Sequence, residues 1–207
     1  MNKDIPDIVI GRLPIYLREL NQMAGSEGLV TTSSQELGRR LDISSAQIRK
    51  DLSHFGEFGK QGTGYHIPYL IDELEKILHL TKSWHVAVIG AGYLGHALVH
   101  YRGFQMRGFI IKCLFDIDEQ KIGAEMGGLT VQDLGELEVT IDEHHVQMAI
   151  LACPPEVAQD VTDRLVKAGV QSLLSYVPVH LNVPNDVQVS YSDPVIQMQR
   201  MTFYLEQ

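Results

Sequence analysis

The segment GAGYLG at residues 90–95 constrains the possible fold of this chain more than any other. An apolar run at 84–89 precedes it and predicts a buried parallel strand, and residues 96–101 predict the start of a helix. A second apolar run at 109–115 leads into Asp116, 21 residues after Gly95. That spacing is close to the ~20 residues expected for the acid that holds an adenosine ribose. Strand, glycine turn, helix and acid together predict a dinucleotide-binding unit.

Each residue type in this loop has a physical role. Gly90 allows the tight turn out of the strand, Gly92 lets the backbone approach a pyrophosphate, and Gly95 lets the helix pack close to the sheet. The diphosphate is expected on free N–H groups at the positive end of the helix dipole. Asp116 would accept hydrogen bonds from both ribose hydroxyls and repel a 2′-phosphate, which favours NAD(H) over NADP(H). The alternative is a glycine turn that binds nothing. The candidate cofactor-binding residues are Gly90, Ala91, Gly92, Tyr93, Leu94, Gly95 and Asp116.

Length and composition restrict the class of protein. A chain of 207 residues, 44% of them hydrophobic, has room for one large or two small domains with real cores. It has no apolar run of 18 residues and no apolar core of a signal peptide at its start, so neither a membrane span nor secretion is expected. The two cysteines, Cys113 and Cys153, lie in apolar runs and are expected to be reduced, buried thiols of a cytoplasmic protein. His144-His145 is interpreted as a solvated helix end, and no metal site is expected.

The charge is distributed unevenly. The net charge of −9 argues against wholesale coating of nucleic acid. Residues 1–80 carry nine Lys/Arg against eleven Asp/Glu, a net charge of −2, whereas residues 81–207 carry eight against fifteen, a net charge of −7. Contact with a short duplex site needs only a local basic patch, which the first 80 residues supply.

Residues 32–55 predict two short helices around a tight turn. The first helix, at 32–41, has a possible capping box from Ser33 to Glu36. The second helix begins at Ser44, with Gln47 completing another possible box. Four leucine or isoleucine side chains form the inner face, and Gln47, Arg49, Lys50 and Ser53 are left to point outward. This arrangement is typical of a helix-turn-helix with donors near the start of its second helix.

A glycine-rich and aromatic segment follows at 55–67 and predicts a β-hairpin wing, with Lys60 at its tip where it could contact a phosphate. The residue pattern leaves open a generic helical domain with an exposed Arg/Lys pair. The candidate DNA-binding residues are Ser44, Ser45, Gln47, Arg49, Lys50, Ser53 and Lys60.

Further elements complete the two regions. An amphipathic helix at 7–23 is expected to bend at Pro14, a helix at 68–78 closes the first region, and 81–83 is a linker. Helices at 133–143 and 156–168 alternate with strands at 147–153 and 170–176 and an edge strand at 187–191, which implies a parallel sheet with helices on both faces. A last helix is capped by Asp193 and Pro194 and is apolar on more than one face, so either its own subunit or a second one must cover it.

The order of these parts resembles the Rex family of redox-sensing transcriptional repressors along essentially the whole chain. The motifs are RLPIYLREL at 12–20, TSSQELGRRL at 32–41, QIRKDLSHFGEFGKQGTGY at 47–65, VIGAGYLGHAL at 88–98 and FDIDEQKIG at 115–123, together with the capped last helix. The resemblance implies an α/β protein with a winged-helix DNA-binding domain at 1–80, a Rossmann NAD(H)-binding domain at 84–191 and a dimerisation helix at 193–207. It also implies a homodimer in which each last helix swaps across to its partner. Such proteins are not enzymes; they bind palindromic operator DNA when NADH is scarce and release it when NADH rises.

The resemblance also implies three switch residues: Arg18, Tyr101 and Asp193. Tyr101 would lie near the cofactor, and Asp193 would pair with Arg18 in one state and accept a hydrogen bond from Tyr101 in the other. Three positions depart from the usual family pattern: Tyr93 stands where a polar or basic residue is usual, Ser175-Tyr176-Val177-Pro178 replaces Asn-Phe-Ala-Pro, and Pro194 follows the key aspartate.

Two other functions compete with that of a repressor. An NAD-dependent dehydrogenase would need a catalytic set and a substrate domain. The sequence offers no suitably placed Tyr-x-x-x-Lys and no His–Asp pair at a helix start near the nicotinamide end. A metabolite-regulated scaffold without a DNA target would not need a basic recognition helix.

Overall fold

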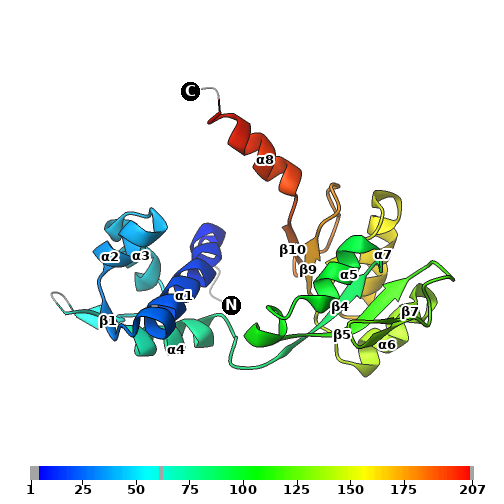
Figure 1. Cartoon of the computed structure of the whole chain (residues 1–207), viewed down its shortest axis with the longest axis horizontal. Coiled ribbons are helices and arrows are strands. Elements are labelled where there is room, and N and C mark those ends of the chain that lie inside the picture. The colour runs from blue at the N-terminus through cyan, green and yellow to red at the C-terminus, as the bar shows by residue number, and fades with distance from the viewer. Residues whose placement is uncertain (1–4, 61–62, 206–207) are drawn as a thin grey trace. The chain divides into compact units, whose positions relative to one another are not determined.

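The chain folds into two compact units, Met1–Lys82 and Ser83–Gln207 (Figure 1). The computed structural model describes residues 5–60 and 63–205, except for the side chain of Lys60. Each unit has a hydrophobic core of its own.

The first unit is a winged helix. It contains α1 (Asp7–Glu27), α2 (Ser34–Leu41), α3 (Ser45–Ser53) and α4 (Ile67–Ile77). Three short strands, β1 (Thr31–Thr32), β3 (Gly64–His66) and β2 (Gly59–Lys60), pair antiparallel in the order β1-β3-β2. Its core is formed by fully buried side chains from all four helices: Leu13, Tyr16, Leu20, Met23, Leu37, Ile48, Leu70 and Leu74. The predicted helix-turn-helix and wing are confirmed, although the wing tip at 61–62 lies outside the described residues.

Local chemistry explains where the helices begin and end. The Ser33 hydroxyl accepts a hydrogen bond from the Glu36 N–H at 3.0 Å and starts α2, and Ser44 does the same for the Gln47 N–H at 3.1 Å and starts α3. Both capping boxes are only half formed, because the Glu36 and Gln47 side chains bond elsewhere. Gly38 makes the tight turn possible, since a Cβ there would lie 2.3 Å from the Ile43 carbonyl oxygen. The first helix continues four residues beyond its predicted end and stops at Gly28, which adopts the left-handed conformation.

The second unit is a Rossmann-type domain with a sheet of seven strands in the order β10-β9-β8-β4-β5-β7-β6. The strands are β4 (Trp84–Ile89), β5 (Phe109–Asp116), β6 (Glu125–Met126), β7 (Leu129–Asp133), β8 (Met148–Leu151), β9 (Ser172–Ser175) and β10 (Gln188–Tyr191). All neighbours pair in parallel except β6 and β7.

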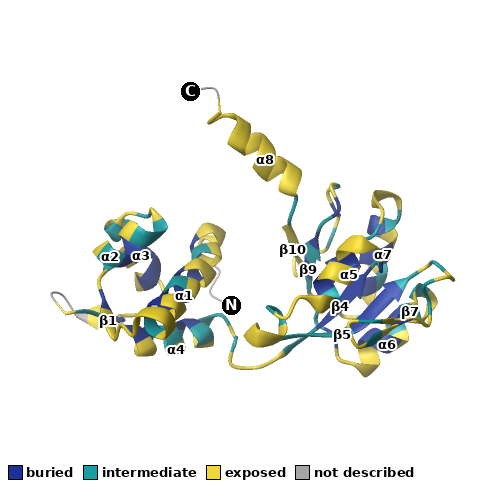
Figure 2. Cartoon of the chain, in the orientation of Figure 1, coloured by how far each residue is buried: buried dark blue, intermediate teal, exposed yellow. Residues whose placement is uncertain are grey.

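Helices cover both faces of this sheet. The helix α5 (Tyr93–His100) packs on one core, and α6 (Leu137–Glu143) and α7 (Pro155–Lys167) pack on the other. Short 3₁₀ turns lie at Gln105–Arg107 and Leu134–Glu136. Figure 2 shows that the central strands are the most deeply buried part of the unit.

The helix after the glycine loop and one hairpin of the second unit differ from the sequence prediction. The helix after the glycine loop begins at Tyr93 rather than 96 and ends at His100, so Tyr101 is the residue that caps it. The hairpin of β6 and β7 was not predicted, although its signal is present: Gly127 and Gly128 both have positive φ, as a two-residue hairpin turn requires.

The last helix, α8 (Pro194–Thr202), begins as predicted, with the Asp193 carboxylate accepting a hydrogen bond from the Val195 N–H at 2.8 Å. None of its residues is buried within the chain. Large apolar side chains of this tail, which we call the tail surface, are 58–79% exposed: Val195, Ile196, Met198, Met201, Phe203, Tyr204 and Leu205. Among the described residues, no helix is both long and apolar enough to cross a membrane.

Candidate functional site

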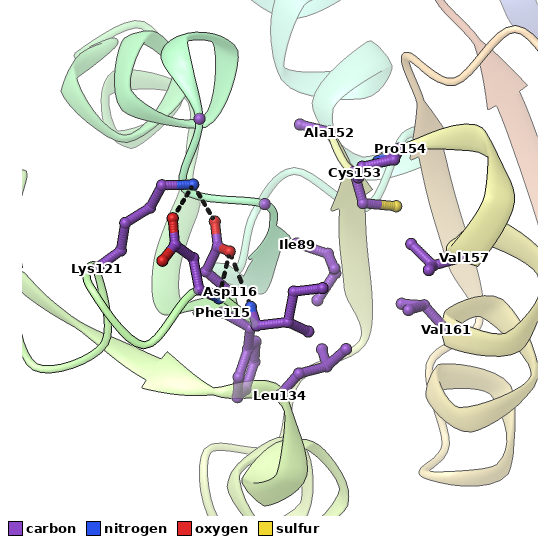
Figure 3. A pocket seen from close by; sticks show the side chains of 14 residues that line it. Ile89, Phe115, Asp116, Lys121, Leu134, Ala152, Cys153, Pro154, Val157 and Val161 are labelled. Atoms are coloured by element: carbon purple, nitrogen blue, oxygen red, sulfur yellow. Dashed lines mark hydrogen bonds and ion pairs between the residues drawn. The ribbon is translucent and has the colours of Figure 1, made fainter.

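A cavity of about 510 Å³ lies at the carboxyl ends of β4, β5 and β8, where open parallel sheets bind their ligands (Figure 3). Its floor comes from the ends of the strands, and α7 contributes an apolar wall. The lining residues are Ile89, Gly90, Gly92, Phe115, Asp116, Ile117, Asp118, Lys121, Leu134, Ala152, Cys153, Pro154, Val157 and Val161.

The three glycines of the loop have different surroundings. A Cβ at Gly90 would lie 2.4 Å from the Ala152 carbonyl oxygen, and one at Gly95 would lie 1.9 Å from the Gly90 carbonyl oxygen. These two glycines are therefore required by the packing of the loop itself. Gly92 has no atom within 4 Å of a Cβ position, and it is the N-cap of α5 without a side-chain cap. The open space at Gly92 fits a group that binds to the backbone N–H donors at the start of α5.

Asp116 is held firmly at the mouth of the cavity. Its Oδ2 accepts a hydrogen bond from the Ala91 N–H at 2.8 Å, and its Oδ1 accepts from the N–H groups of Ile117 and Asp118 at 2.8 and 3.0 Å. Lys121 Nζ lies 3.2 Å from Oδ2. Burial opposes ionisation of Asp116, but the hydrogen bonds from Asp118, Ala91 and Lys121 outweigh it and lower the pKa of the carboxyl. Asp116 is therefore an ionised acceptor in a fixed orientation.

The other predicted cofactor residues lie outside the cavity lining. The Tyr93 side chain is fully exposed, Leu94 is exposed, and Gly95 is buried beneath the loop. Tyr101 is exposed and packs edge-on against Phe104, with ring centroids 5.3 Å apart. The structure thus brings Gly90, Gly92 and Asp116 together around the cavity, and the Ala91 N–H donates to the Asp116 carboxylate. The roles of Tyr93, Leu94 and Tyr101 stay predictions.

Several lining residues were not identified from the sequence. Lys121 and Asp118 reach the cavity because residues 118–122 form a turn, in which the Asp118 carbonyl accepts from the N–H groups of Lys121 and Ile122. Cys153 was expected to be buried but is half-buried and lines the cavity, and burial raises its pKa. Cys113 is buried as expected, which raises its pKa to about 12.

Two of the departures from the family pattern have a defined local role in this structure. Ser175 is buried, and its hydroxyl accepts a hydrogen bond from the Val177 N–H at 3.2 Å, which fixes the turn after β9. Pro194 occupies the first helical position of α8, where a missing N–H costs nothing.

The candidate DNA-reading surface is the exposed side of α3. Arg49, Lys50 and Ser53 are exposed as predicted. Arg49 Nη1 donates to the Ser34 hydroxyl at 2.9 Å, so the side chain extends toward the start of α2. Ser44 caps the helix, and Ser45 is half-buried in its first turn. The backbone of Lys60 lies in β2, but its side chain lies outside the described part of the chain.

Gln47 does not point outward as predicted. It is half-buried, and its amide donates to Asp51 Oδ1 at 2.7 Å. Asp51 is fully buried on α3 and also accepts two hydrogen bonds from Arg12, at 2.5 and 2.7 Å, and one from the Tyr16 hydroxyl at 2.6 Å. Burial opposes ionisation of Asp51, but these donors prevail and lower its pKa. This Asp51 cluster fixes α3 to α1, which carries Arg12 and Tyr16.

The predicted switch residues belong to different units. Arg18 is exposed on α1 in the first unit, and Asp193 caps α8 in the second. Within the described residues, no group of three or more His, Cys, Asp or Glu is placed to hold a metal ion.

Comparison with known proteins gives consistent matches over both units. Residues 4–53 match the family described as putative DNA-binding protein N-terminus, and residues 81–179 match the CoA binding domain. The Redox-sensing transcriptional repressor Rex of Roseiflexus sp. (strain RS-1) is 51% identical over 200 residues, covering 97% of this chain and 90% of the relative. The protein of the same name from Brevibacillus brevis is 40% identical over 204 residues, covering 99% of this chain and 98% of the relative.

Three solved structures of RSP, one of them described as a Rex-family repressor, are similar over almost the whole chain. The complex of RSP with β-NAD⁺ and operator DNA has a TM-score of 0.93 and 34% identity, covering 99% of this chain and 94% of RSP. The complex of RSP with β-NADH has a TM-score of 0.90 and 32% identity, covering 99% of this chain and 95% of RSP.

Proposed function

Since this chain belongs to the Rex family of redox-sensing transcriptional repressors, we propose that its second unit binds NADH and NAD⁺ and that the bound form determines whether its first unit holds operator DNA. The protein is a repressor rather than an enzyme. The observation that carries the proposal is the cavity at Gly92 and Asp116 in the same chain as a winged helix. Action on operator DNA implies a cytoplasmic location.

The residues around the cavity fit the adenosine diphosphate half of the cofactor. The open backbone at Gly92 would receive the pyrophosphate at the N-terminus of α5. Asp116, ionised and already oriented by three backbone N–H groups, would accept hydrogen bonds from the ribose hydroxyls. Leu134, Val157 and Val161 give the apolar surface that an adenine ring needs. When bound, the cofactor supplies the redox signal itself, because NAD⁺ and NADH differ by one hydride and by the charge of the nicotinamide ring.

For DNA binding, α3 is the recognition helix. Arg49 and Lys50 would contact bases or phosphates, and Lys60 on the wing would contact the backbone. Ser44, Ser45, Gln47 and Ser53 complete the proposed surface. Gln47 would act on DNA only if it left Asp51, so we propose it as a minor contributor.

The redox signal must become a change of geometry, and this happens only if NADH binds one arrangement of the protein more tightly than the other. We assign this role to Arg18, Tyr101 and Asp193, which would connect the two units in a homodimer whose last helices are exchanged. The tail surface supports the proposal of a dimer, because seven large exposed apolar side chains on one short tail favour burial against another surface. Asp193→Asn keeps the helix cap but removes the ion pair. The variant should form a stable dimer that binds operator but responds poorly to NADH, or one that binds operator poorly throughout.

The experiment that tests the proposed function is a gel shift with a pool of palindromic operator sequences, in the presence of NADH, NAD⁺ or neither. We expect a retained DNA band that NADH abolishes and NAD⁺ preserves. Absence of DNA binding under all three conditions would contradict the proposed repressor function. Turnover of NADH with a co-substrate would favour the dehydrogenase alternative.

A further inference from the structure

The mouth of the nucleotide cavity contains a second carboxylate and a cation besides Asp116. Lys121 Nζ lies 3.2 Å from Asp116 Oδ2 and 3.4 Å from Asp118 Oδ2, so one ammonium bridges two carboxylates (Figure 3). Lys121 is also the one basic residue among those that line the cavity in the described part of the chain. The local charge is therefore one cation against two anions.

The two carboxylates are not equivalent. The Asp116 side chain is 10% exposed and already holds three backbone N–H groups. The Asp118 side chain is 41% exposed; its Oδ1 accepts from the Gln120 N–H at 3.0 Å, and its Oδ2 faces Lys121. The turn at 118–122 returns the lysine over both acids, because its N–H bonds to the Asp118 carbonyl at 2.9 Å. Asp118 therefore supplies a second negative charge beside the Lys121 ammonium, in addition to that of Asp116.

A lysine beside the ribose acid would otherwise favour a phosphorylated ribose. Cofactor sites that accept a 2′-phosphate place a basic side chain near it, and a lysine ammonium binds phosphate as a point charge. In this chain the ammonium is already satisfied by two carboxylates, so a 2′-phosphate would gain little from it and would meet the negative charge of Asp118. This reasoning rests on the proposed function, in which the ribose lies at Asp116.

We propose that Asp118 and Lys121 are specificity-determining residues of the nucleotide site: Asp118 neutralises Lys121 and thereby makes the site reject 2′-phosphorylated dinucleotides such as NADPH. Lys121 also positions Asp116, because its ammonium occupies the Oδ2 side of that carboxylate. Discrimination between NADH and NADPH is thus a property of the three charges together.

The test compares variants of the full-length protein by calorimetric titration with NADH and with NADPH. Asp118→Asn keeps the size of the side chain and the acceptor for Gln120 while it removes the charge. We expect the ratio of the NADPH dissociation constant to the NADH dissociation constant to fall about tenfold, as removal of one partly exposed charge near a phosphate allows. Adding Lys121→Gln to this variant should restore the wild-type ratio or raise it further.

Glu119→Gln is the matched control. It removes one negative charge from the adjacent exposed position, which does not line the cavity, and should leave the ratio unchanged. The inference is overturned if Asp118→Asn leaves the ratio at its wild-type value or if Glu119→Gln lowers it equally. It is also overturned if the ratio stays low when Lys121→Gln is added to Asp118→Asn. Failure of the wild-type protein to bind NADH in the same titration would instead overturn the proposed function. Unchanged melting temperatures establish that the variants are folded.

Discussion

Replacement of Asp51 by alanine should weaken the first unit far more than the loss of an ordinary acid. The substitution removes the acceptor of four hydrogen bonds and leaves the hydroxyl of Tyr16 and part of the Arg12 guanidinium buried without a partner. Breaking a buried ion pair from one side costs about 3–5 kcal/mol. We expect the lower value, about 3 kcal/mol, because the Arg12 side chain keeps 19% exposure and can regain water. A unit of this size has a total stability of roughly 4–12 kcal/mol.

Hydrogen exchange measured by mass spectrometry on the full chain resolves the effect by segment. Peptides from α1 and α3 should exchange about 150-fold faster, the factor that corresponds to a loss of about 3 kcal/mol. Peptides from β4 and β8 should keep their protection, because they belong to the other core. Asp51→Asn preserves the side-chain volume and keeps one acceptor oxygen, so its loss should be smaller than that of Asp51→Ala, although its amide N–H₂ faces other donors.

Glu57→Ala is the control, because Glu57 is exposed and surface substitutions of this kind stay within about 0.5 kcal/mol. Exchange of α1 and α3 in Asp51→Ala within threefold of wild type would refute the reasoning that the Asp51 cluster fixes these helices together.

Three further predictions concern the glycine loop at 90–95, the DNA-reading surface of α3 and the stability of the first unit at low pH. Gly92→Ala should fold but lose NADH binding. Gly95→Ala should instead lower the melting temperature of the second unit by many degrees, because its Cβ would lie 1.9 Å from the Gly90 carbonyl oxygen. Calorimetry of both variants checks this. Arg49→Ala should weaken operator binding by about 1–3 kcal/mol for a base contact, or lower the salt slope by about one for a phosphate contact, in a fluorescence anisotropy titration. The pKa of Asp51 is lower in the folded unit than its ordinary 3.8. The stability that this group contributes is therefore present above that pH and is lost as the pH falls below it. Acid titration by circular dichroism should show the first unit intact at about pH 5 and unfolding only below about pH 4.

The sequence predicted the parts of the site that depend on local spacing. The tight packing around Gly90 and Gly95 and the position of Asp116 at the end of β5 follow from a strand, a tight turn and a second strand, and the structure shows both. The ribose-binding role of Asp116 stays a prediction. The sequence could not reveal that the ammonium of Lys121 lies against Asp116, because this depends on how the turn at 118–122 folds back.

Gln47 shows a second limit of sequence reasoning. Helical periodicity leaves it outside the apolar face, yet it turns toward Asp51, whose other partners come from a helix 35 and 39 residues earlier in the chain. No periodic pattern in one helix records a partner at such a separation.

The exposed apolar tail has a consequence for gene dosage. If a second copy of the chain covers the tail surface, as proposed, the population of complete repressors depends on how often two chains meet. When the concentration of chains lies well below the dissociation constant of the dimer, that population grows with the square of the number synthesised. Halving the expression of the gene would then remove about three quarters of the complete repressors under this mass-action relation. A cell could therefore derepress the target genes by modest dilution, with no change in its NADH pool.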